Sequence, residues 1–343
     1  MSNIQKAFSH GKAFIGFVTG GDPSCEKTVE FVLAMERAGA SLIEIGIPFS
    51  DPIAEGPVIQ EANVRALKNG ANVAKMFKIV ENVRKVSDVP IVFLTYFNPV
   101  FRYGCSESEN VARKTESGAQ FCPAPDTVAD ECIGDESGAD PISGSSTGST
   151  VGGSGRPVLR SGVRGAPPHI NFPASTEPFF RACMTAGVDG VIIPDLPFEE
   201  ACEVKADAAK CGVDIISMIA PTSSQGGAKK TTDGGETESR AACIAKSASG
   251  FVYVVSSMGV TGVRANIETD LTALVQAVKS NGDVPAAVGF GVNTPKQAGE
   301  IAKIADGVIV GSAIVKICAG YGVDAAPHIE SYVREMVAQV VGN

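Results

Sequence analysis

An apolar run followed by a helical pattern recurs eight times along this chain, and this alternation limits the possible folds more than any other feature. The apolar runs are AFIGFV from Ala13, SLIEI from Ser41, PIVFLTY from Pro90, VDGVIIP from Val188, VDIISMI from Val213, GFVYVV from Gly250, VPAAVGF from Val284 and DGVIVG from Asp306. Stretches such as EKTVEFVLAMERAG and LTALVQAVKSNG follow them, with apolar residues three and four positions apart and a closing glycine. The alternation indicates a parallel sheet covered by helices.

Eight such units predict an α/β fold of the (β/α)8 type, the TIM barrel, as a single domain over residues 1–343. A weak internal echo supports this interpretation. The segments AGASLIEIGIP, AGVDGVIIPDLP and IADGVIVGSA each run from a small residue that ends a helix into a strand.

Two stretches break the alternation. Residues 105–175, after the third strand, contain GDESGADPISGSSTGSTVGGSGRP, and Ile, Leu, Val and Phe make up only roughly 15% of them, too few for a core. Residues 225–237, after the fifth strand, read QGGAKKTTDGGET. We expect a long disordered insertion and a short one in loops of the barrel. Gene segments wrongly joined into the chain are the alternative explanation.

Composition and charge exclude several classes of protein. The 343 residues are 44% hydrophobic and carry a formal net charge of -9, with no basic stripe, which argues against nucleic-acid binding. No long apolar helix or signal-type pattern opens the chain, so we expect a cytoplasmic protein with no membrane contact. Among the nine cysteines, the pair Cys122 and Cys132 has no nearby histidine, and we expect no metal site.

Two carboxylates flank one loop. Glu44 closes the strand-like run SLIEI, and Glu55 follows in the segment GIPFSDPIAEGP. A carboxylate among Leu42, Ile43 and Ile45 loses hydration, which raises its pKa toward a value suited to a general acid or base. Glu55 lies in polar loop sequence, and we expect it to stay ionised. The alternative is that Glu44 sits at a strand end and reaches water.

Glycines at the ends of the last two strands suggest an anion site. Gly289-Phe290-Gly291 ends the seventh strand, and Gly311-Ser312 ends the eighth, directly before the helical AIVKI. Loops after strands seven and eight of a TIM barrel commonly bind phosphate through backbone amides and a helix N-terminus. The loop SSMGVTG, after the sixth strand, is a candidate lid. Tight turns are the alternative explanation for the glycines at the strand ends, and an ordinary connection is the alternative for the SSMGVTG loop.

The motifs FVTGGDPS, LIEIGIPFSDPIAEGPVIQ, GVTG and GFGVNTP with DGVIVGSAIVK, in this order, resemble the tryptophan synthase alpha chain family. The resemblance covers nearly all of the chain outside the two insertions. It implies retro-aldol cleavage of indole-3-glycerol phosphate to indole and glyceraldehyde 3-phosphate, without a cofactor. It also implies a beta chain partner that consumes the indole, in an alpha2beta2 tetramer.

The resemblance also implies roles for single residues. Glu44 matches the general acid/base, and Glu55 matches the carboxylate that accepts the indole N–H, where the family pattern has Asp; the extra methylene adds roughly 1.5 Å of reach. Residues implied to bind the substrate are Phe17, Tyr253, Thr261, Gly262, Gly291, Gly311 and Ser312. For Phe17 and Tyr253, filling of the barrel is the alternative. Further residues that match the family are Thr19, Asp22, Asp51 and Asp195. A capping role is the alternative for Asp22, and a turn role is the alternative for Asp51 and Asp195.

The long insertion and the glutamate at position 55 leave three hypotheses for the role of the chain. The insertion follows YFNPVFRYG on the face that carries the active site, where the family contacts the beta chain. An alpha subunit that binds a beta chain is the first hypothesis. A stand-alone indole-3-glycerol-phosphate lyase is the second, because the insertion could block that contact. A weakly active regulatory subunit is the third, because Glu55 replaces the usual Asp.

Overall fold

Eight parallel strands form a closed barrel in which each strand pairs with the next in chain order and the last pairs with the first. The computed structural model describes residues 3–104, 175–221, 223, 239–255, 264–289 and 291–342. The strands are β1 (Ala13–Thr19), β2 (Leu42–Gly46), β3 (Ile91–Leu94), β4 (Gly190–Ile192), β5 (Asp214–Ile219), β6 (Val252–Val255), β7 (Ala286–Gly289) and β8 (Gly307–Val310). The TIM barrel prediction is confirmed, and most strands are somewhat shorter than their apolar runs.

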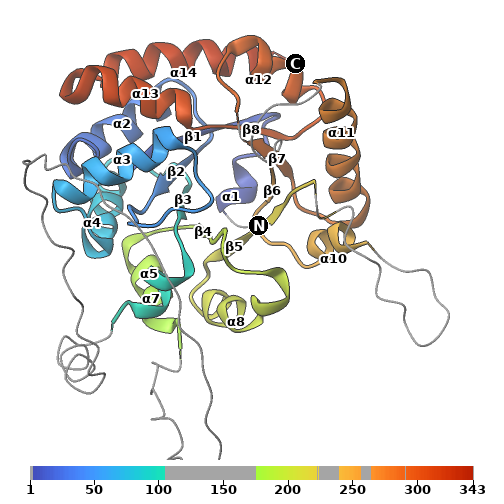
Figure 1. Cartoon of the computed structure of the whole chain (residues 1–343), viewed down its shortest axis with the longest axis horizontal. Coiled ribbons are helices and arrows are strands. Elements are labelled where there is room, and N and C mark those ends of the chain that lie inside the picture. Colours follow the sequence, from blue (N-terminus) through green and yellow to red (C-terminus); the bar gives the residue numbers. More distant parts are fainter. Residues whose placement is uncertain are drawn as a thin grey trace, which may run out of the picture. The chain divides into compact units, whose positions relative to one another are not determined.

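An outer ring of helices covers the barrel (Figure 1). In the described part of the chain its members are α2 (Cys25–Arg37), α4 (Val73–Arg84), α7 (Glu177–Ala186), α8 (Cys202–Lys210), α10 (Arg240–Lys246), α11 (Arg264–Asn281), α12 (Pro295–Ala302) and α14 (Ala326–Val341). Local sequence sets several of their ends. Ser24 and Asn72 cap α2 and α4, Thr294 forms a capping box with Gln297 at α12, and Gly187 ends α7 at φ 87°.

The strands are buried on both faces, which explains their continuous apolar runs. Outward side chains such as Phe14 and Ile43 pack against helix residues such as Phe31 and Met35. Inward side chains, including Ile15, Leu42, Val92, Ile192 and Ile309, fill the barrel itself. Burying each large apolar side chain contributes about 1.5–3 kcal/mol, so the filled interior is a rigid support for the groups at its rim.

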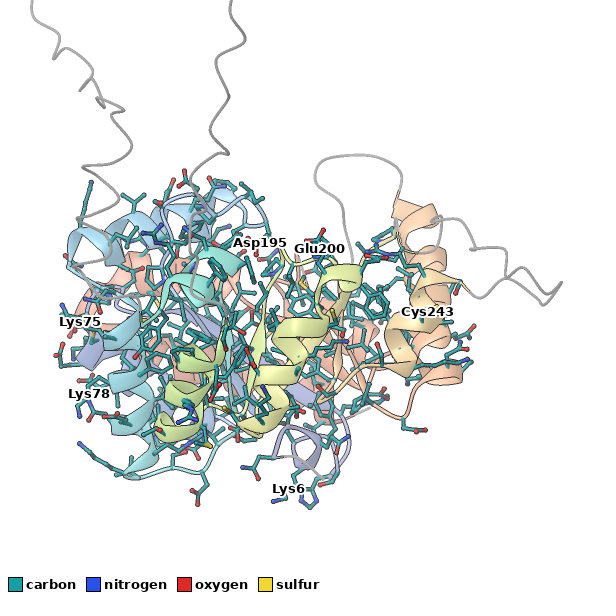
Figure 2. The ribbon with its side chains drawn as sticks, turned by 90° about the horizontal axis from the view of Figure 1, so that it is seen from below. Lys6, Lys75, Lys78, Asp195, Glu200 and Cys243 are labelled. Carbon is teal, nitrogen blue, oxygen red and sulfur yellow. The ribbon has the colours of Figure 1, made fainter. Side chains whose placement is uncertain are left out.

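A short helix closes the N-terminal end of the barrel. In Figure 1, α1 (Asn3–Lys6) lies at the centre of the ring of strands, and Figure 2 shows Lys6 at the end of the molecule opposite Asp195 and Glu200. Ile4 of α1 is fully buried. A Cβ atom on Gly190 would lie 2.7 Å from Ile4 Cδ1 and 3.0 Å from the backbone oxygen of Asp214, so glycine suits this position in β4. The opposite, C-terminal end of the strands is the one that a TIM barrel uses for its chemistry.

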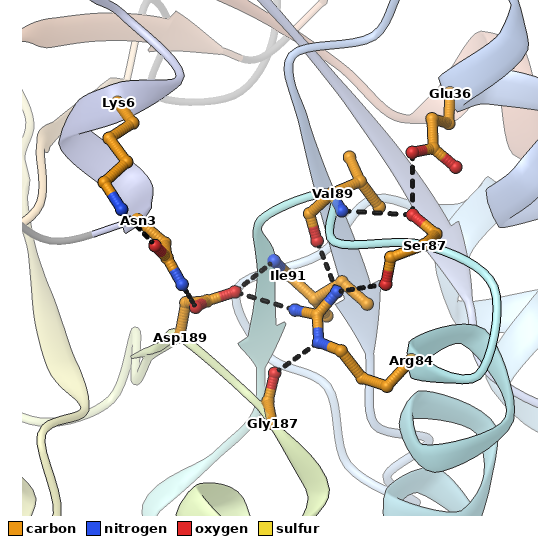
Figure 3. A network of polar contacts seen from close by, with 9 residues as sticks. All are labelled: Asn3, Lys6, Glu36, Arg84, Ser87, Val89, Ile91, Gly187 and Asp189. Atoms are coloured by element: carbon orange, nitrogen blue, oxygen red, sulfur yellow. Dashed lines mark hydrogen bonds and ion pairs between the residues drawn. The ribbon is translucent and has the colours of Figure 1, made fainter.

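A polar network ties the elements around α1 together (Figure 3). Asp189, just before β4, accepts hydrogen bonds from Ile91 N (2.8 Å), Asn3 Nδ2 (3.0 Å) and Arg84 (2.8 Å). Arg84 also donates to the backbone oxygens of Gly187 and Val89. One ion pair therefore joins α1, α4, β3 and β4, and the sequence pattern did not predict it.

Additional helices lie outside the regular alternation. They are α3 (Pro57–Lys68), α5 (Phe97–Arg102) and α13 (Ser312–Tyr321), together with the 3-10 turns η1 (Phe198–Glu200) and η2 (Gly322–Asp324). Arg65 of α3 forms a two-pronged ion pair with Asp22, at 3.0 and 2.8 Å, which fixes α3 to the loop after β1. Chain contacts group Met1–Gly104 with Pro173–Asn343 into the barrel unit. The predicted insertions, 105–175 and 225–237, fall almost wholly outside the described residues.

Candidate active site

Inward-facing side chains of three strands form the core of the site. Phe17 of β1 and Glu44 of β2 are paired in the strand register, and Tyr253 projects from β6. Phe17 and Glu44 belong to the buried interior, with 3% and 2% of their surface exposed. The sequence motifs placed all three in the site, and the fold brings them to the mouth of one barrel.

Glu44 is a carboxylic acid with almost no contact with water. Burial raises its pKa to about 8, and the charge of Glu55 adds to this increase. Its Oε2 atom is buried and has no hydrogen-bond partner in the described part of the chain. At neutral pH Glu44 is therefore mostly protonated, and it holds a proton that it can deliver to a group placed in the barrel mouth.

Glu55 stands in the loop between β2 and α3 and is half-buried. Its Oε2 atom accepts a hydrogen bond of 2.7 Å from Asn63 Nδ2. Burial raises the pKa of Glu55 to about 7, although the Asn63 bond opposes the increase. The expectation that Glu55 stays ionised was therefore wrong, because the polar loop packs against the barrel and buries part of the Glu55 side chain. Near pH 7 Glu55 is divided between its two forms.

Two glycines make room for Phe17. A Cβ atom on Gly46 would lie 2.7 Å from Phe17 Cζ, and one on Gly311 would lie 3.2 Å from Phe17 Cδ1. The ring thus lies between the end of β2 and the start of α13. Phe17 fills the barrel, as its structural alternative predicted, and its contact with a substrate stays a prediction.

Tyr253 leans across the mouth of the barrel toward β7. Its ring occupies the space beside Gly289, where a Cβ atom would lie 2.7 Å from Tyr253 Cζ. Burial raises the pKa of the Tyr253 hydroxyl well above its usual range, and the charge of Glu44 adds to the increase. Tyr253 therefore stays neutral and presents an uncharged hydroxyl group close to Glu44.

The glycine-rich side of the mouth suits an anion. Gly311 caps α13 without a side-chain hydrogen bond, and the first turn of α13, which begins at Ser312, holds no acidic residue. Gly291 is exposed at φ 77°, and a Cβ atom placed on it would meet no described heavy atom within 4 Å. Free backbone amides at a helix N-terminus attract phosphate. Thr261 and Gly262, predicted to share this role, lie outside the described residues, as does Phe290.

Comparisons with known proteins agree with this geometry. The family model described as tryptophan synthase alpha chain matches residues 4–126 and 170–340. The chain belongs to the tryptophan synthase alpha chain family. It is therefore a lyase of tryptophan biosynthesis, as the sequence motifs indicated.

Individual members of the tryptophan synthase alpha chain family are similar over most of their length. The tryptophan synthase alpha chain of Lacticaseibacillus casei is 37% identical, over 98% of this chain and 94% of its own. The alpha subunit structure from Legionella pneumophila str. Paris has a TM-score of 0.68 at 26% identity, with 100% of both chains covered. A tryptophan synthase complex from Pyrococcus furiosus contains a chain with a TM-score of 0.64 at 27% identity, covering 96% of this chain and 99% of that one.

Several acidic residues that match the alpha chain family have structural partners here. Asp22 pairs with Arg65, while Ser24 rather than Asp22 caps α2. Asp195 accepts a hydrogen bond of 2.9 Å from Phe97 N and so joins the loops after β3 and β4. Asp51 is exposed and accepts a hydrogen bond from Ser50. The capping alternative for Asp22 is therefore wrong, and the contact of Asp195 links two loops rather than closing a turn.

Thr19 is different from these acids. Its hydroxyl oxygen, at the end of β1, is buried without a hydrogen-bond partner in the described structure. Only 1% of its surface is exposed.

The sequence motifs missed two residues that support the site. Tyr96, which follows β3, accepts a hydrogen bond of 3.0 Å from Ala54 N and stacks on Phe49. Asn63 holds the carboxylate of Glu55. A signal for Asn63 was present, because an amide on the same buried helix face as Ala62 and Ala66 needs a polar partner.

Two predicted absences concern the same described residues. There, no three His, Cys, Asp or Glu side chains gather as they would around a metal ion. Nor does any helix there have the length and hydropathy of a membrane span. Cys122 and Cys132 fall outside it.

Proposed function

We propose that this chain cleaves indole-3-glycerol phosphate to indole and glyceraldehyde 3-phosphate by a retro-aldol reaction at the mouth of the barrel. The observation that carries the proposal is Glu44, a buried acid whose pKa of about 8 keeps it protonated at neutral pH. Across the same mouth, α13 and the glycines beside it offer an anion site. A proton donor and a phosphate site separated by an apolar floor match this substrate.

Glu44 is the proposed general acid and base. It delivers its proton to ring carbon 3, which turns the indole into an electron-accepting iminium group. The resulting carboxylate then removes the proton of the adjacent side-chain hydroxyl. The carbon–carbon bond breaks, its electrons restore the aromatic ring, and the hydroxyl carbon becomes the aldehyde. Glu44 ends the cycle protonated, so no external acid is consumed.

Glu55 is the proposed electrostatic partner of the ring nitrogen. Protonation of carbon 3 places positive charge on that nitrogen, and an ionised carboxylate that accepts its N–H stabilises the charge. Glu55 performs this role only when ionised, whereas Glu44 starts the reaction only when protonated. The two groups thus require opposite states at one pH.

Binding of the rest of the substrate is assigned to the surrounding side chains and amides. Phe17 and Tyr253 contact the ring. The phosphate is held by Gly291, Gly311 and Ser312, together with Thr261 and Gly262. We further propose a cytoplasmic enzyme that assembles with a beta chain in an alpha2beta2 tetramer. The similarity to a chain of a tryptophan synthase complex supports this assembly.

Single-turnover cleavage by a Glu44→Gln variant tests the proposal. Glutamine keeps the shape of the side chain and cannot exchange a proton, so we expect indole release to fall at least about 100-fold. Glu200→Gln is the matched control, because Glu200 is exposed on the same end of the molecule (Figure 2) and is expected to leave the rate unchanged. Near-normal cleavage by Glu44→Gln would show that the proposed mechanism is wrong.

Two alternatives have their own discriminating results. Strong stimulation of cleavage by a beta chain argues against a stand-alone lyase, whereas high turnover without a partner favours it. A large gain in cleavage by Glu55→Asp favours a regulatory subunit with a compromised site. The Asn63 contact supports an active site built around Glu55.

A further inference from the structure

Asn63 contacts the carboxylate of Glu55 from a protected position. It lies on α3 with 3% of its surface exposed, and its Nδ2 atom is 2.7 Å from Glu55 Oε2. A bond of this length to a charged acceptor belongs to the strong class of hydrogen bonds. Because burial excludes competing water, the contact determines where this carboxylate oxygen lies.

The surrounding contacts hold both partners in place. Gln60 Nε2 donates to the backbone oxygen of Glu55 at 2.9 Å. On the other side, Ala54 N donates to the hydroxyl of Tyr96, which is buried at the end of β3. The Arg65 ion pair with Asp22 fixes α3 itself to the loop after β1. The backbone of the loop is therefore held, and the remaining freedom is in the Glu55 side chain.

A glutamate has one more rotatable bond than an aspartate, so its carboxylate samples more positions. We propose that Asn63 is a positioning residue for cleavage, whose amide holds one Glu55 oxygen and leaves the other free to accept the indole N–H. The inference rests on the proposed function, since it takes Glu55 as the partner of the ring nitrogen. It explains how the longer acid reaches a defined position.

The hydrogen bond between Asn63 and Glu55 is expected to affect the pH dependence of cleavage, because it changes the pKa of Glu55. The titratable groups that face Glu55 in the described structure are Glu44 from β2 and Tyr96 from the end of β3. Burial raises the pKa of Glu55 to about 7 and Asn63 opposes that increase. Cleavage is expected to rise through an apparent pKa near 7, as Glu55 ionises, and to fall near 8, as Glu44 loses its proton.

The test is the pH profile of kcat/KM for wild type, Asn63→Ala, Asn63→Asp and Asn69→Ala. Asn63→Ala removes the donor, and we expect kcat/KM at pH 7 to fall about tenfold while the acid limb moves up by roughly one pH unit. Asn63→Asp, of nearly equal volume, adds a like charge and moves the limb further. Asn69 is the control, because it ends the same helix and donates to Pro23 O instead. The phosphate of the substrate titrates equally in all variants.

A double variant separates positioning from a general loss of structure. In a Glu55→Gln background we expect Asn63→Ala to have almost no effect, since the group that it positions is gone. An equal loss at every pH and in both backgrounds would overturn the inference while leaving the proposed function intact. Normal cleavage by Glu55→Gln alone would overturn the role of Glu55, and the inference with it.

Discussion

Glu44 points into the barrel between apolar neighbours, so its ionised form is costly in the folded protein. Burial raises its pKa to about 8, while an unfolded chain restores an ordinary value near 4.3. Because the folded pKa is the higher one, the stabilising contribution of this group is fully present below about pH 4 and is lost as the pH rises to about 8. The residue that the chemistry needs therefore destabilises the fold at working pH.

We predict that Glu44→Gln stabilises the protein in a pH-dependent way. The gain in unfolding free energy over wild type is expected to be larger at pH 8.5 than at pH 5.5 by on the order of 3 kcal/mol. Urea denaturation at both pH values measures it, with Glu200→Gln as a control that gains nothing. A gain that does not change with pH would contradict the burial of an ionisable Glu44.

Residues of the site differ in how far the sequence could reveal them. The family motifs singled out Phe17, Glu44 and Tyr253. The alternation of side chains along a strand explains why all three point inward. The ionisation of Glu55 could not be read in the same way. It depends on α3 folding over the loop and on Asn63 meeting the carboxylate, and these contacts come from packing rather than from local pattern.

At the scale of elements, the polar network of Arg84 and Asp189 stabilises the barrel at its N-terminal end, opposite the active site. The Arg84 and Asp189 side chains are only 20% and 13% exposed, and each also bonds to backbone groups at the starts of β3 and β4. Removal of one partner leaves a half-buried charge without its counterion, which is far costlier than loss of a surface pair.

We predict that Arg84→Ala lowers the free energy of unfolding by about 3 kcal/mol. Lys78→Ala on the same helix is the control, since the Lys78–Glu81 pair is 65% and 41% exposed and is expected to contribute less than about 1 kcal/mol. Cleavage per folded molecule should be normal in both variants, because the network lies at the end opposite the site. Equal losses in the two variants would contradict a structural role for the network.

Elements of the regular alternation were predictable, and the helices outside it were not. Parallel strands covered on both sides read as continuous apolar runs, so all eight were found. The segment that forms α3 follows a loop rich in glycine and proline, and the alternation of apolar runs does not assign it. Its position depends on the Arg65 contact with Asp22, far away in sequence, which no periodicity records.

At the scale of the whole molecule, the main question is how the chain accommodates the residues that the family model leaves unmatched. The family model matches residues 4–126 and 170–340 and leaves 127–169 unmatched. The barrel closes from strands on both sides of this gap, since β3 pairs with β4. The entropy of closing a loop grows only slowly with its length, so a barrel tolerates either a long or a short connection there.

We therefore predict that joining residue 126 directly to residue 170 preserves both the fold and cleavage of indole-3-glycerol phosphate. Circular dichroism and single-turnover rates compare the shortened chain with the full one. We expect a rate within about threefold, because both chains keep Glu44 on β2 and α13 directly after β8. Stimulation by a beta chain, measured in parallel, shows whether the segment hinders assembly: a larger increase in the shortened chain means that it does. The intact mass of the protein from its natural source tells an insertion from a wrongly joined gene segment. Loss of cooperative unfolding on deletion would instead make these residues a part of the barrel.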